Sequence, residues 1–358
     1  MKIGIIGCGK ISSAYLSCAN LFPLLEITWC ADLLPRRAKA QAREFGVPRS
    51  GTVAQLLADP DVDLVINLTI PAAHTEVNRA ILMAGKHVFC EKPFALNRED
   101  GAELLALARK QGLRIGSAPD TFLGEAHQTC RKLIDGGAIG KVVAATAFMA
   151  SHGPEGWHPN PAFFYQPGAG PMFDMGPYYL TAMVNMMGPM ARVTGFAATA
   201  FAERKGGAKS LPRKKFKVTT PTHLTGAIEF ASGAVATVIM SFDVWGHSLP
   251  MLQLHGTKGS LDVPDPNGTH GTPATYKIAA KSWEPVPLAY PSIYGEKYGR
   301  GAGVAEMAEA IIEGRPHRAN GEMALHVVDA MQAILESAEK GRAVELGTRC
   351  ERPVGIAS

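Results

Sequence analysis

Two charged residues follow a short apolar run near residue 90. The stretch "GKHVFCEKP", residues 85–93, has the composition of a buried strand up to Cys90 and continues with Glu91, Lys92 and Pro93. An ammonium group at the end of a strand can stabilise negative charge on a reacting oxygen. A solvated ion pair in a surface turn would have the same composition, so this stretch alone leaves both interpretations open.

A glycine-containing turn near the N-terminus has the spacing of a nucleotide-binding fingerprint. In "IGIIGCGKISSAYL", residues 3–16, the three glycine positions of that fingerprint hold Gly7, Gly9 and Ser12. Glycine at position 7 permits the tight turn, and glycine at position 9 lets backbone amides approach a pyrophosphate. Ser12 departs from the pattern, but a small residue there still allows the helix to pack closely on the strand.

A carboxylate follows the second apolar run at the distance this fingerprint requires. About 20 residues beyond Ser12, the run at 26–31 is followed by Asp32. Its carboxylate can accept both hydroxyls of an adenosine ribose and repel a 2′-phosphate, which favours NAD over NADP. Arg36 and Arg37 follow closely and could serve a phosphate instead, so NADP is the less favoured alternative.

The elements that must position these residues alternate regularly up to about residue 120. Apolar runs typical of strands buried on both faces are separated by segments with helical periodicity. Strands are expected at 2–6, 26–31, 63–68, 86–90 and 113–117, and helices at 12–22, 35–46, 52–60, 72–85 and 98–112. This alternation predicts a parallel, doubly wound sheet that binds ligands at its carboxyl edge.

Beyond residue 120 the strands become longer. A helix at 124–140 precedes a strand at 141–152, a hairpin at 223–244 should turn at Ser232 and Gly233, and two helices are expected at 302–313 and 321–340. Both faces of the hairpin's second strand are largely apolar. We therefore expect one face to pack on helices and the other on a second subunit, with burial inside one subunit as the alternative.

Composition narrows the class of protein. The formal net charge of +4 is too mild to indicate nucleic acid binding by itself, and the basic run at 204–217 is typical of a solvated loop, with anion binding as the alternative. No apolar stretch of about 20 residues could span a bilayer. Six cysteines without a CxxC pair predict reduced thiols and a cytoplasmic location. We expect a small-molecule substrate and neither a nucleic acid nor a membrane partner.

Five motifs in one order resemble a known family. Gly7-Cys8-Gly9, Asp32, "TIPAAH" at 69–74, "EKP" at 91–93 and "GAGPMFDMGPYY" at 168–179 resemble the Gfo/Idh/MocA family of glucose-fructose oxidoreductases and inositol dehydrogenases. The resemblance covers nearly the whole chain. It implies an NAD-binding Rossmann domain at 1–120, and an α+β domain at 121–358 with an open, mainly antiparallel sheet. That second domain would bind substrate and form a homodimer or homotetramer.

The resemblance also implies roles for three residues. The lysine of the EKP motif contacts the substrate hydroxyl and the nicotinamide ribose in such proteins, so Lys92 should do likewise. The family's GGGxxxDxGxH pattern falls at 168–178, where Ala169 replaces the central glycine and Tyr178 replaces the histidine. A phenol has an unperturbed pKa of about 10, so Tyr178 needs a cation such as Lys92 to act as a base. Asp174, four residues before Tyr178 on one helix face, should orient substrate hydroxyls or Lys92.

The substrate and cofactor sites can be assigned on this basis. Trp157 and His158 lie in a loop rich in proline and glycine, and sugar sites combine an aromatic face with directional polar groups. A solvated loop histidine is the alternative for His158, a tyrosine that only hydrogen-bonds in the core is the alternative for Tyr178, and no metal site is expected. The predicted substrate-binding residues are Lys92, Trp157, His158, Asp174 and Tyr178. The predicted cofactor-binding residues are Gly7, Gly9, Lys10, Ile11, Asp32, Thr69, Pro71, His74, Glu91 and Lys92.

Three functions are compatible with these residues. The first is an NAD-dependent oxidoreductase that transfers a hydride to or from a carbinol carbon of a sugar or cyclitol. The second is a glycoside-cleaving enzyme that oxidises its substrate transiently, eliminates the aglycone and returns the hydride. The third is a regulator that binds nicotinamide without turnover, although such a protein would need neither Lys92 nor a proton-bearing Tyr178.

Overall fold

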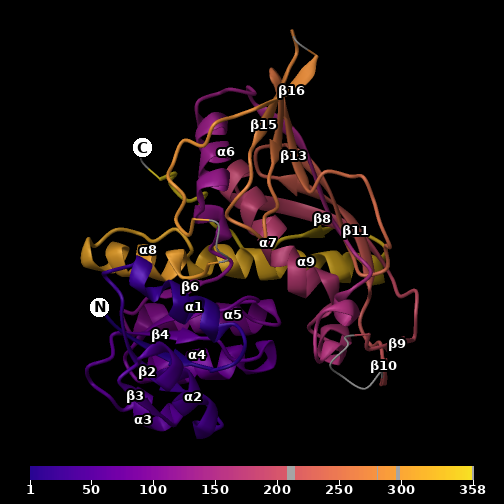
Figure 1. The fold of residues 1–358 in the computed structure, drawn as a ribbon. Coiled ribbons are helices and arrows are strands. Elements are labelled where there is room, and N and C mark those ends of the chain that lie inside the picture. Colours follow the sequence, from indigo (N-terminus) through magenta and orange to yellow (C-terminus); the bar gives the residue numbers. More distant parts are fainter. Residues whose placement is uncertain (208–213, 280, 296–298, 357–358) are drawn as a thin grey trace. The chain divides into compact units, whose positions relative to one another are not determined.

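The chain forms two compact units. The structure is a computed structural model that describes residues 1–207, 214–279, 281–295 and 299–356 (Figure 1). Unit 1 comprises Met1–Gly124 and Pro291–Val328, and unit 2 comprises Glu125–Tyr290 and the chain from Asp329 onward. The division predicted at residue 120 differs from this grouping, because residues 291–328 pack with the N-terminal unit.

Unit 1 contains a six-stranded sheet in the order β3-β2-β1-β4-β5-β6, and every neighbouring pair is parallel. The strands are β1 (Lys2–Ile6), β2 (Glu26–Ala31), β3 (Arg49–Gly51), β4 (Leu64–Asn67), β5 (His87–Cys90) and β6 (Ile115–Ser117). The four residues of β4 are all buried, as expected for a strand covered on both faces. The predicted parallel, doubly wound sheet is confirmed.

The helices of unit 1 begin and end where the sequence provides the appropriate residues. They are α1 (Ser12–Cys18), α2 (Pro35–Phe45), α3 (Val53–Leu57), α4 (His74–Met83) and α5 (Arg98–Lys110), with short 3-10 turns η1 (Ala19–Leu21), η2 (Pro71–Ala73) and η3 (Thr121–Leu123). Pro35 occupies the first turn of α2, and Gly46 ends that helix with a φ of 71°. Thr52 and Gln55 form a capping box at the start of α3.

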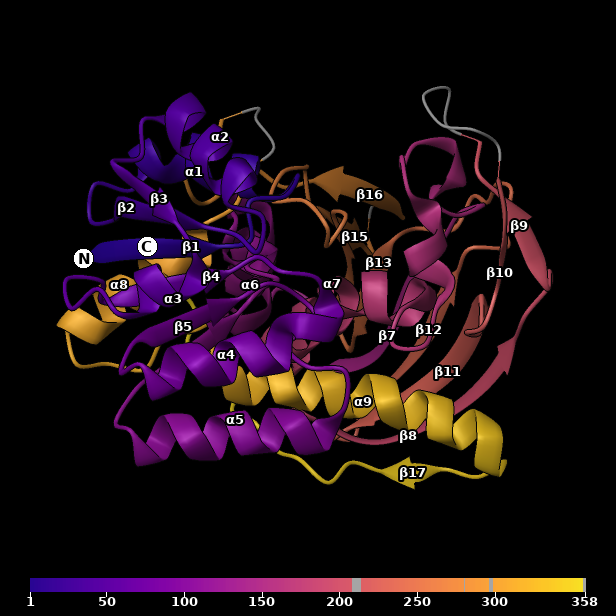
Figure 2. The ribbon, with the colours of Figure 1, turned by 90° about the horizontal axis from the view of Figure 1, so that it is seen from below.

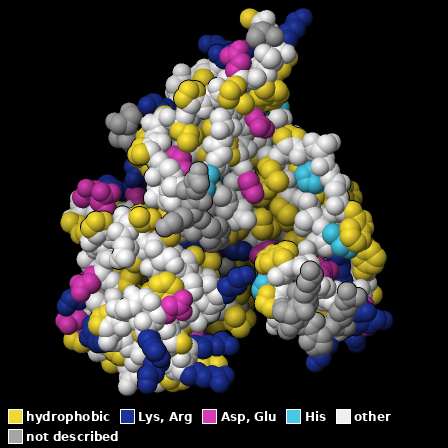
Figure 3. Space-filling model, viewed as in Figure 1, with side chains coloured by type: hydrophobic (Ala, Val, Ile, Leu, Met, Phe, Trp, Pro, Cys, Tyr) yellow, Lys and Arg dark blue, Asp and Glu magenta, His cyan; other side chains and the backbone are white. Residues whose placement is uncertain are grey.

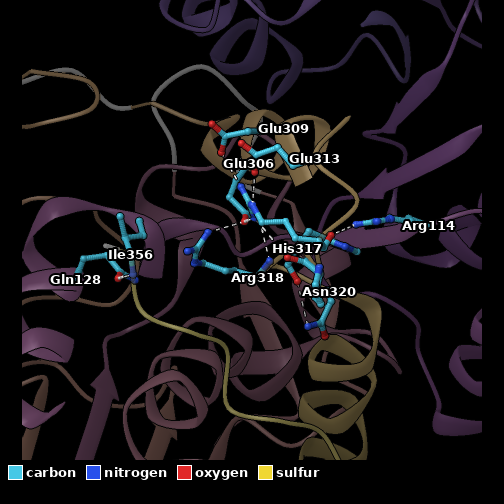
Figure 4. A network of polar contacts seen from close by, with 11 residues as sticks. Arg114, Gln128, Glu306, Glu309, Glu313, His317, Arg318, Asn320 and Ile356 are labelled. Atoms are coloured by element: carbon cyan, nitrogen blue, oxygen red, sulfur yellow. Dashed lines mark hydrogen bonds and ion pairs between the residues drawn. The ribbon is translucent and has the colours of Figure 1, made fainter. Parts of the chain in front are cut away.

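Polar contacts hold residues 291–328 in unit 1. This segment contains α8 (Ala302–Ile312) and the start of α9 (Gly321–Lys340). Within the segment, Arg315 pairs with Glu306, Glu309 and Glu313 at 2.6, 2.6 and 2.5 Å. Arg318 pairs with Glu306 at 2.7 Å (Figure 4). Arg114 of the N-terminal part donates to the Arg315 carbonyl. The amide of Ser117 in β6 donates to the Ala319 carbonyl at 3.0 Å, which covers the edge of the sheet.

Unit 2 contains a nine-stranded mixed sheet in the order β16-β15-β14-β13-β7-β12-β11-β8-β17. Only the β12–β7 pair among these is parallel, so the predicted mainly antiparallel sheet is confirmed. The hairpin of β11 and β12 turns at Ser232 and Gly233 as predicted, and Gly233 has a φ of 83°. The strands are β7 (Val142–Ala150), β8 (Met190–Ala198), β11 (His223–Phe230), β12 (Val235–Ser241), β13 (Leu252–Gly256), β14 (Gly259–Val263), β15 (Ala274–Lys277), β16 (Ser282–Pro285) and β17 (Val344–Glu345).

One face of this sheet is covered by helices. It packs against α6 (Glu125–Asp135), α7 (Gly170–Met187) and the later part of α9, and Figure 2 shows α7 and α9 beside the strands. Along β12, Ala236, Val238 and Met240 are buried, whereas Val235 on the opposite face is exposed. Phe196 in β8 is 76% exposed on that opposite face. The predicted packing of one face on helices is confirmed.

Two shorter features complete unit 2. The basic run at 204–217 includes β9 (Glu203–Lys205) and β10 (Lys215–Lys217), which pair antiparallel, while its central residues 208–213 lie outside the described part of the chain. Between β7 and α7 lie two 3-10 turns, η4 (Pro154–Gly156) and η5 (Pro161–Tyr165). Across the described residues, none of the helices has the length and hydrophobicity needed to cross a membrane.

Candidate active site

The turn between β1 and α1 requires glycine at one position and leaves space at another. Gly7 has a φ of 99°, and a Cβ there would lie 2.6 Å from the carbonyl carbon and oxygen of Leu68. At Gly9 a Cβ would meet no atom within 4 Å, so the backbone is open to an approaching ligand. Buried Ser12 donates its hydroxyl to the Gly9 carbonyl at 2.6 Å, which accounts for serine in place of the third glycine. The turn therefore fits a pyrophosphate.

Asp32 ties this turn to the end of β2. Its two carboxylate oxygens accept the amide of Cys8 and the amide of Leu34, each at 2.8 Å. A carboxylate has about four lone-pair sites, so both oxygens keep capacity for ribose hydroxyls. Arg36 and Arg37 are exposed on α2, and Figure 3 shows lysine and arginine side chains gathered around that helix. The carboxylate fits NAD, while the arginines keep the NADP alternative open.

The loop after β4 is organised by a buried asparagine. The Asn67 side-chain oxygen accepts the amide of Thr69 at 3.1 Å and the hydroxyl of Thr69 at 2.7 Å. The Asn67 side-chain amide donates to Asn78 at 2.8 Å, which anchors the loop to α4. Pro71 opens η2 at the carboxyl edge of the sheet, next to exposed Ile70. The predicted cofactor residues Thr69 and Pro71 therefore lie in a fixed loop.

His74 joins this loop to the next one. Its Nδ1 lies 2.7 Å from the Pro93 carbonyl and its Nε2 lies 3.0 Å from the Thr69 carbonyl. The ring is fully buried, and burial lowers its pKa against the opposing effect of the two carbonyls. His74 therefore holds two loops of the carboxyl edge together, and its predicted role in cofactor binding stays a prediction.

Glu91 and Lys92 follow β5 inside a hydrogen-bonded arrangement. The Glu91 carboxylate accepts the Tyr15 hydroxyl at 3.0 Å and the Lys92 amide at 2.9 Å. The Glu91 amide donates to the Asn67 carbonyl at 2.9 Å. Because Glu91 is only 7% exposed, a solvated surface ion pair does not describe it. Lys92 is half-buried and is followed by a cis peptide bond to Pro93.

Three further buried residues of unit 1, namely Asp120, Tyr15 and Arg300, were not identified from the sequence. Asp120, just after β6, accepts the amides of Gly301 and Gly303 at 3.1 and 2.8 Å. Burial raises the pKa of Asp120, although Arg300 opposes this shift, and burial also raises the pKa of Tyr15. No local pattern could reveal them, because Arg300 reaches this part of the fold from a distant segment.

In unit 2, Asp174 and Tyr178 lie on α7 with the predicted spacing of one helix face. Gly170, at the start of α7, has a φ of 77°, and a Cβ there would lie 2.9 Å from the Pro221 carbonyl. Tyr178 is buried and Asp174 is half-buried. The adjacent Tyr179 has a different role, because its buried hydroxyl donates to Asp265 at 3.4 Å and contacts the sulfur of Met251 at 3.3 Å.

The loop after β7 presents an aromatic cluster. Trp157 is 62% exposed, and the His158 ring lies 5.4, 5.3 and 5.0 Å from the rings of Trp157, Phe163 and Phe164. The amide of Asn160 donates to His158 Nδ1 at 3.0 Å, so a neutral ring carries its proton on Nε2. His158 is therefore packed among aromatic rings and is more than a solvated loop residue.

Each unit thus gathers part of the predicted site. Unit 1 contains the complete set of predicted cofactor residues. Among them, Lys10 is exposed, and half-buried Ile11 directly precedes α1. Unit 2 contains Trp157, His158, Asp174 and Tyr178. The meeting of Lys92 with Tyr178 stays a prediction. Within the described ranges, no group of three or more His, Cys, Asp or Glu residues could hold a metal ion.

Family models match both parts of the chain. Residues 1–118 match the model described as "Oxidoreductase family, NAD-binding Rossmann fold", and residues 127–262 match the "GFO/IDH/MocA C-terminal domain". Together the two models account for most of the chain.

Two similar proteins and one solved structure agree with these models. The chain is 35% identical over 158 residues to a 1,5-anhydro-D-fructose reductase of Ensifer adhaerens, a match that spans 43% of this chain and 47% of that protein. It is 27% identical over 97% of its length to the whole of D-xylose 1-dehydrogenase (NADP(+)) 2 of Haloferax volcanii. A structure of levoglucosan dehydrogenase in complex with NADH and L-sorbose has a TM-score of 0.83 at 21% identity, over 97% of this chain and 99% of that one, which shows the same fold.

Proposed function

Because the chain belongs to the Gfo/Idh/MocA family of oxidoreductases, with an NAD-binding Rossmann domain, we propose that it transfers a hydride between a nicotinamide and a carbinol carbon of a sugar, cyclitol or sugar derivative. The observation that carries this proposal is the placement of Lys92 directly after Glu91, whose buried carboxylate is held by Tyr15. This arrangement lies at the carboxyl edge of a parallel sheet, where such sheets bind their ligands.

The cofactor would be held by the residues of that edge. The turn at Gly7 and Gly9 would receive the pyrophosphate, Asp32 the adenosine ribose, and the loop at Thr69 the part nearer the nicotinamide. When bound, the nicotinamide supplies the acceptor or donor of the hydride. Asp32 supports NAD as the cofactor, whereas the NADP(+) in the name of the Haloferax volcanii relative supports the alternative.

The proton would be managed by Lys92 and Tyr178. In the direction of oxidation, the substrate hydroxyl loses its proton to the Tyr178 phenolate as its carbon loses the hydride. The Lys92 ammonium stabilises the negative charge on that oxygen and also favours the phenolate. In reduction, the Tyr178 phenol returns the proton. Asp174 would orient a substrate hydroxyl or Lys92 from the same face of α7.

The substrate would be bound by the aromatic loop of unit 2 together with Lys92, Asp174 and Tyr178. Trp157 offers an apolar face, and the Nε2–H of neutral His158 is a directional donor. The named relatives act on sugars and sugar derivatives, which supports the same substrate class here. Packing of the open sheet face of unit 2 against a second copy would complete a homodimer or homotetramer.

The experiment is a substrate panel. Purified protein is incubated with NAD or NADP and with sugars, cyclitols and glycosides, while nicotinamide absorbance and product release are followed together. The proposal predicts net formation of NADH that matches the amount of substrate oxidised. Release of aglycone without net NADH would favour the glycoside-cleaving alternative, and binding without either product would favour the regulator.

A further inference from the structure

A single buried arginine in unit 2 holds two loops together. Arg204 lies in β9, and each of its two terminal nitrogens bonds to a different loop, one after β7 and the other after β12. One terminal nitrogen, NH1, donates to the His152 carbonyl at 3.0 Å and to Glu155 Oε1 at 2.9 Å. The other, NH2, donates to the Phe242 carbonyl at 2.9 Å and to Asp243 Oδ1.

The two loops begin at equivalent places. His152 follows β7 and Phe242 follows β12, which are parallel neighbours, so both loops leave the same edge of the sheet. Each loop gives Arg204 one backbone carbonyl and one carboxylate. A planar guanidinium with donors in a fixed fork suits this paired arrangement better than an ammonium.

Both carboxylates of this cluster accept hydrogen bonds at each of their two oxygens. The remaining oxygen of Glu155 accepts the Tyr165 hydroxyl at 2.5 Å, and the remaining oxygen of Asp243 accepts the Thr222 hydroxyl at 2.7 Å. The Arg204 guanidinium also lies 5.3 Å from the centre of the Tyr165 ring. The buried Arg204 Nε has no hydrogen-bond partner among the described residues, but the bonds from both terminal nitrogens and the paired carboxylates hold the two loops in a defined position.

Each loop carries a tryptophan that faces solvent. Trp157 in the first loop is 62% exposed, and Trp245 in the second is 83% exposed. The Trp245 ring stacks on the His152 ring with 3.3 Å between centroids and 14° between planes. The carbonyl of the same His152 is bound by Arg204, so the guanidinium supports both tryptophans through the loops that bear them.

We propose that Arg204 is a positioning residue that holds Trp157 and Trp245 as two aromatic binding surfaces for the apolar C–H face of a pyranose ring. This inference rests on the proposed function and extends it, since Arg204 and Trp245 act on substrate affinity and specificity without taking part in proton transfer. Indole rings offer a large apolar area at a low cost in conformational entropy, which suits recognition of a rigid ring. A sugar bound here would be selected by the shape of its apolar face.

The first experiment measures KM for the sugar and for the cofactor in three variants, Arg204→Lys, Trp157→Ala and Trp245→Ala. Lysine keeps the charge but cannot bond both loops as the guanidinium does. Each variant should raise the KM for the sugar by about tenfold or more, while the KM for NAD stays within about twofold. An Arg204→Lys variant with wild-type sugar KM would overturn the proposal.

A matched control separates positioning from general stability. Arg131 is another buried arginine of unit 2, bound to the Asn185 carbonyl at 2.7 Å and to Asp135 at 2.7 Å. Arg131→Lys should lower the thermal unfolding midpoint as Arg204→Lys does, yet leave the sugar KM within about twofold of the wild type. Equal increases of sugar KM in both variants would show that Arg204 has only a structural role.

A double-mutant cycle tests the dependence of Trp245 on Arg204. If Arg204 positions Trp245, the double variant should lose little more affinity for the sugar than Arg204→Lys alone. If the two substitutions lower the affinity for the sugar by independent factors that multiply in the double variant, the proposal is overturned. Should Arg204→Lys fail to fold, the charge-matched variant Arg204→Met with Glu155→Gln and Asp243→Asn takes its place, because it leaves no buried carboxylate without a partner.

Sugar binding is also followed without turnover, by quenching of tryptophan fluorescence. Quenching that is lost in Trp245→Ala and weakened in Arg204→Lys supports the inference. If no sugar in the panel is oxidised, that result counts against the proposed function but not against the inference. Conversely, oxidation with a wild-type sugar KM in these variants would refute the inference and leave the proposed function intact.

Discussion

The carboxylate of Asp32 serves both the fold and the proposed cofactor site. Its oxygens accept the amides of Cys8 and Leu34, so the glycine turn and the end of β2 are held together by one side chain. Hydrogen bonds to a charged group contribute about 1.5–3 kcal/mol. The same carboxylate would repel a 2′-phosphate, and Arg36 and Arg37 on α2 would attract one. Cofactor preference therefore depends on which of these groups lies nearer the ribose.

Substituting Asp32 distinguishes these effects. Asp32→Ala should raise the Kd for NADH by about 10-fold to 100-fold and change the Kd for NADPH much less, because the ribose hydroxyls lose an acceptor and a repulsive charge disappears. Both constants are measured by fluorescence titration, with Asp61→Ala, an exposed carboxylate of the same unit, as the control. Equal increases in both constants would mean that Asp32 only holds the turn.

Candidate site residues could be predicted from the sequence where they stand in a recognisable sequence motif. Lys92, Asp174 and Tyr178 stand in short motifs that resemble those of a known family, and it was this resemblance that made them candidates. Tyr15 and Arg204 could not be identified in this way. Their importance comes from carboxylates that approach from distant segments, such as Glu91 beside Tyr15.

At the scale of elements, the glycine turn combines two backbone features that suit the proposed cofactor site. Gly7 combines a left-handed φ of 99° with a close approach to Leu68. Gly9, two residues further on, faces open space. The two glycines therefore have different tasks, because the first shapes the turn and the second keeps room for a ligand.

Alanine at each position should produce different defects. Gly7→Ala should lower the thermal unfolding midpoint, since backbone strain of about 1–3 kcal/mol adds to the clash with Leu68. Gly9→Ala should unfold close to the wild-type temperature but raise the Kd for NADH by about tenfold. Thermal unfolding and NADH titration of both variants check this. Normal NADH binding in a stable Gly9→Ala protein would refute a pyrophosphate site at this turn.

Periodicity predicted most elements of unit 1 and the β11–β12 hairpin. The three-residue strand β3 was missed because "RSG" has neither apolar alternation nor β-branched residues. The first helix ends earlier than predicted, at Cys18, and continues as a 3-10 turn through residues 19–21. In both cases the local sequence signal is weak, and packing against neighbouring elements decides the outcome.

At the scale of the whole molecule, unit 2 exposes apolar residues on one face of its sheet. Phe196, Ile239 and Phe148 lie on β8, β12 and β7 in one cross-strand row, in which Thr225 of β11 stands between Phe196 and Ile239. Phe196 is 76% exposed and the other three are half-buried. Contiguous apolar surface of this kind marks protein interfaces, which supports association with a second copy.

The mass of the protein in solution tests this association. Wild-type protein should have the mass of a dimer or tetramer by light scattering, and Phe196→Lys should shift it towards the monomer because the ammonium cannot be buried in an apolar interface. Met83→Lys, a change at an exposed apolar residue of unit 1, should leave the mass unchanged. A monomeric wild-type protein would contradict the assignment of this face.

The grouping of residues 291–328 with unit 1 could not be predicted by dividing the chain at one point. Arg315, Arg318 and their glutamate partners lie within this segment, and the carbonyl of Arg315 accepts a bond from Arg114 of the N-terminal part (Figure 4). The bond between Arg114 and Arg315 joins residues that are far apart in sequence. Local composition therefore indicated the helices of this segment correctly, but gave no information about the unit in which they pack.

In the proposed reaction, Lys92 and Tyr178 manage the proton of a sugar hydroxyl during hydride transfer. The most direct measurement compares turnover of NAD with the best sugar in wild type, Lys92→Ala and Tyr178→Phe, with NADH binding measured on the same preparations. Both variants should still bind NADH, Tyr178→Phe within about twofold of wild type and Lys92→Ala with a modest loss, because Lys92 is also expected to contact the nicotinamide ribose. Their turnover should fall by about 100-fold or more, as expected for loss of a general acid–base group. Wild-type turnover in both variants would contradict the roles proposed for Lys92 and Tyr178.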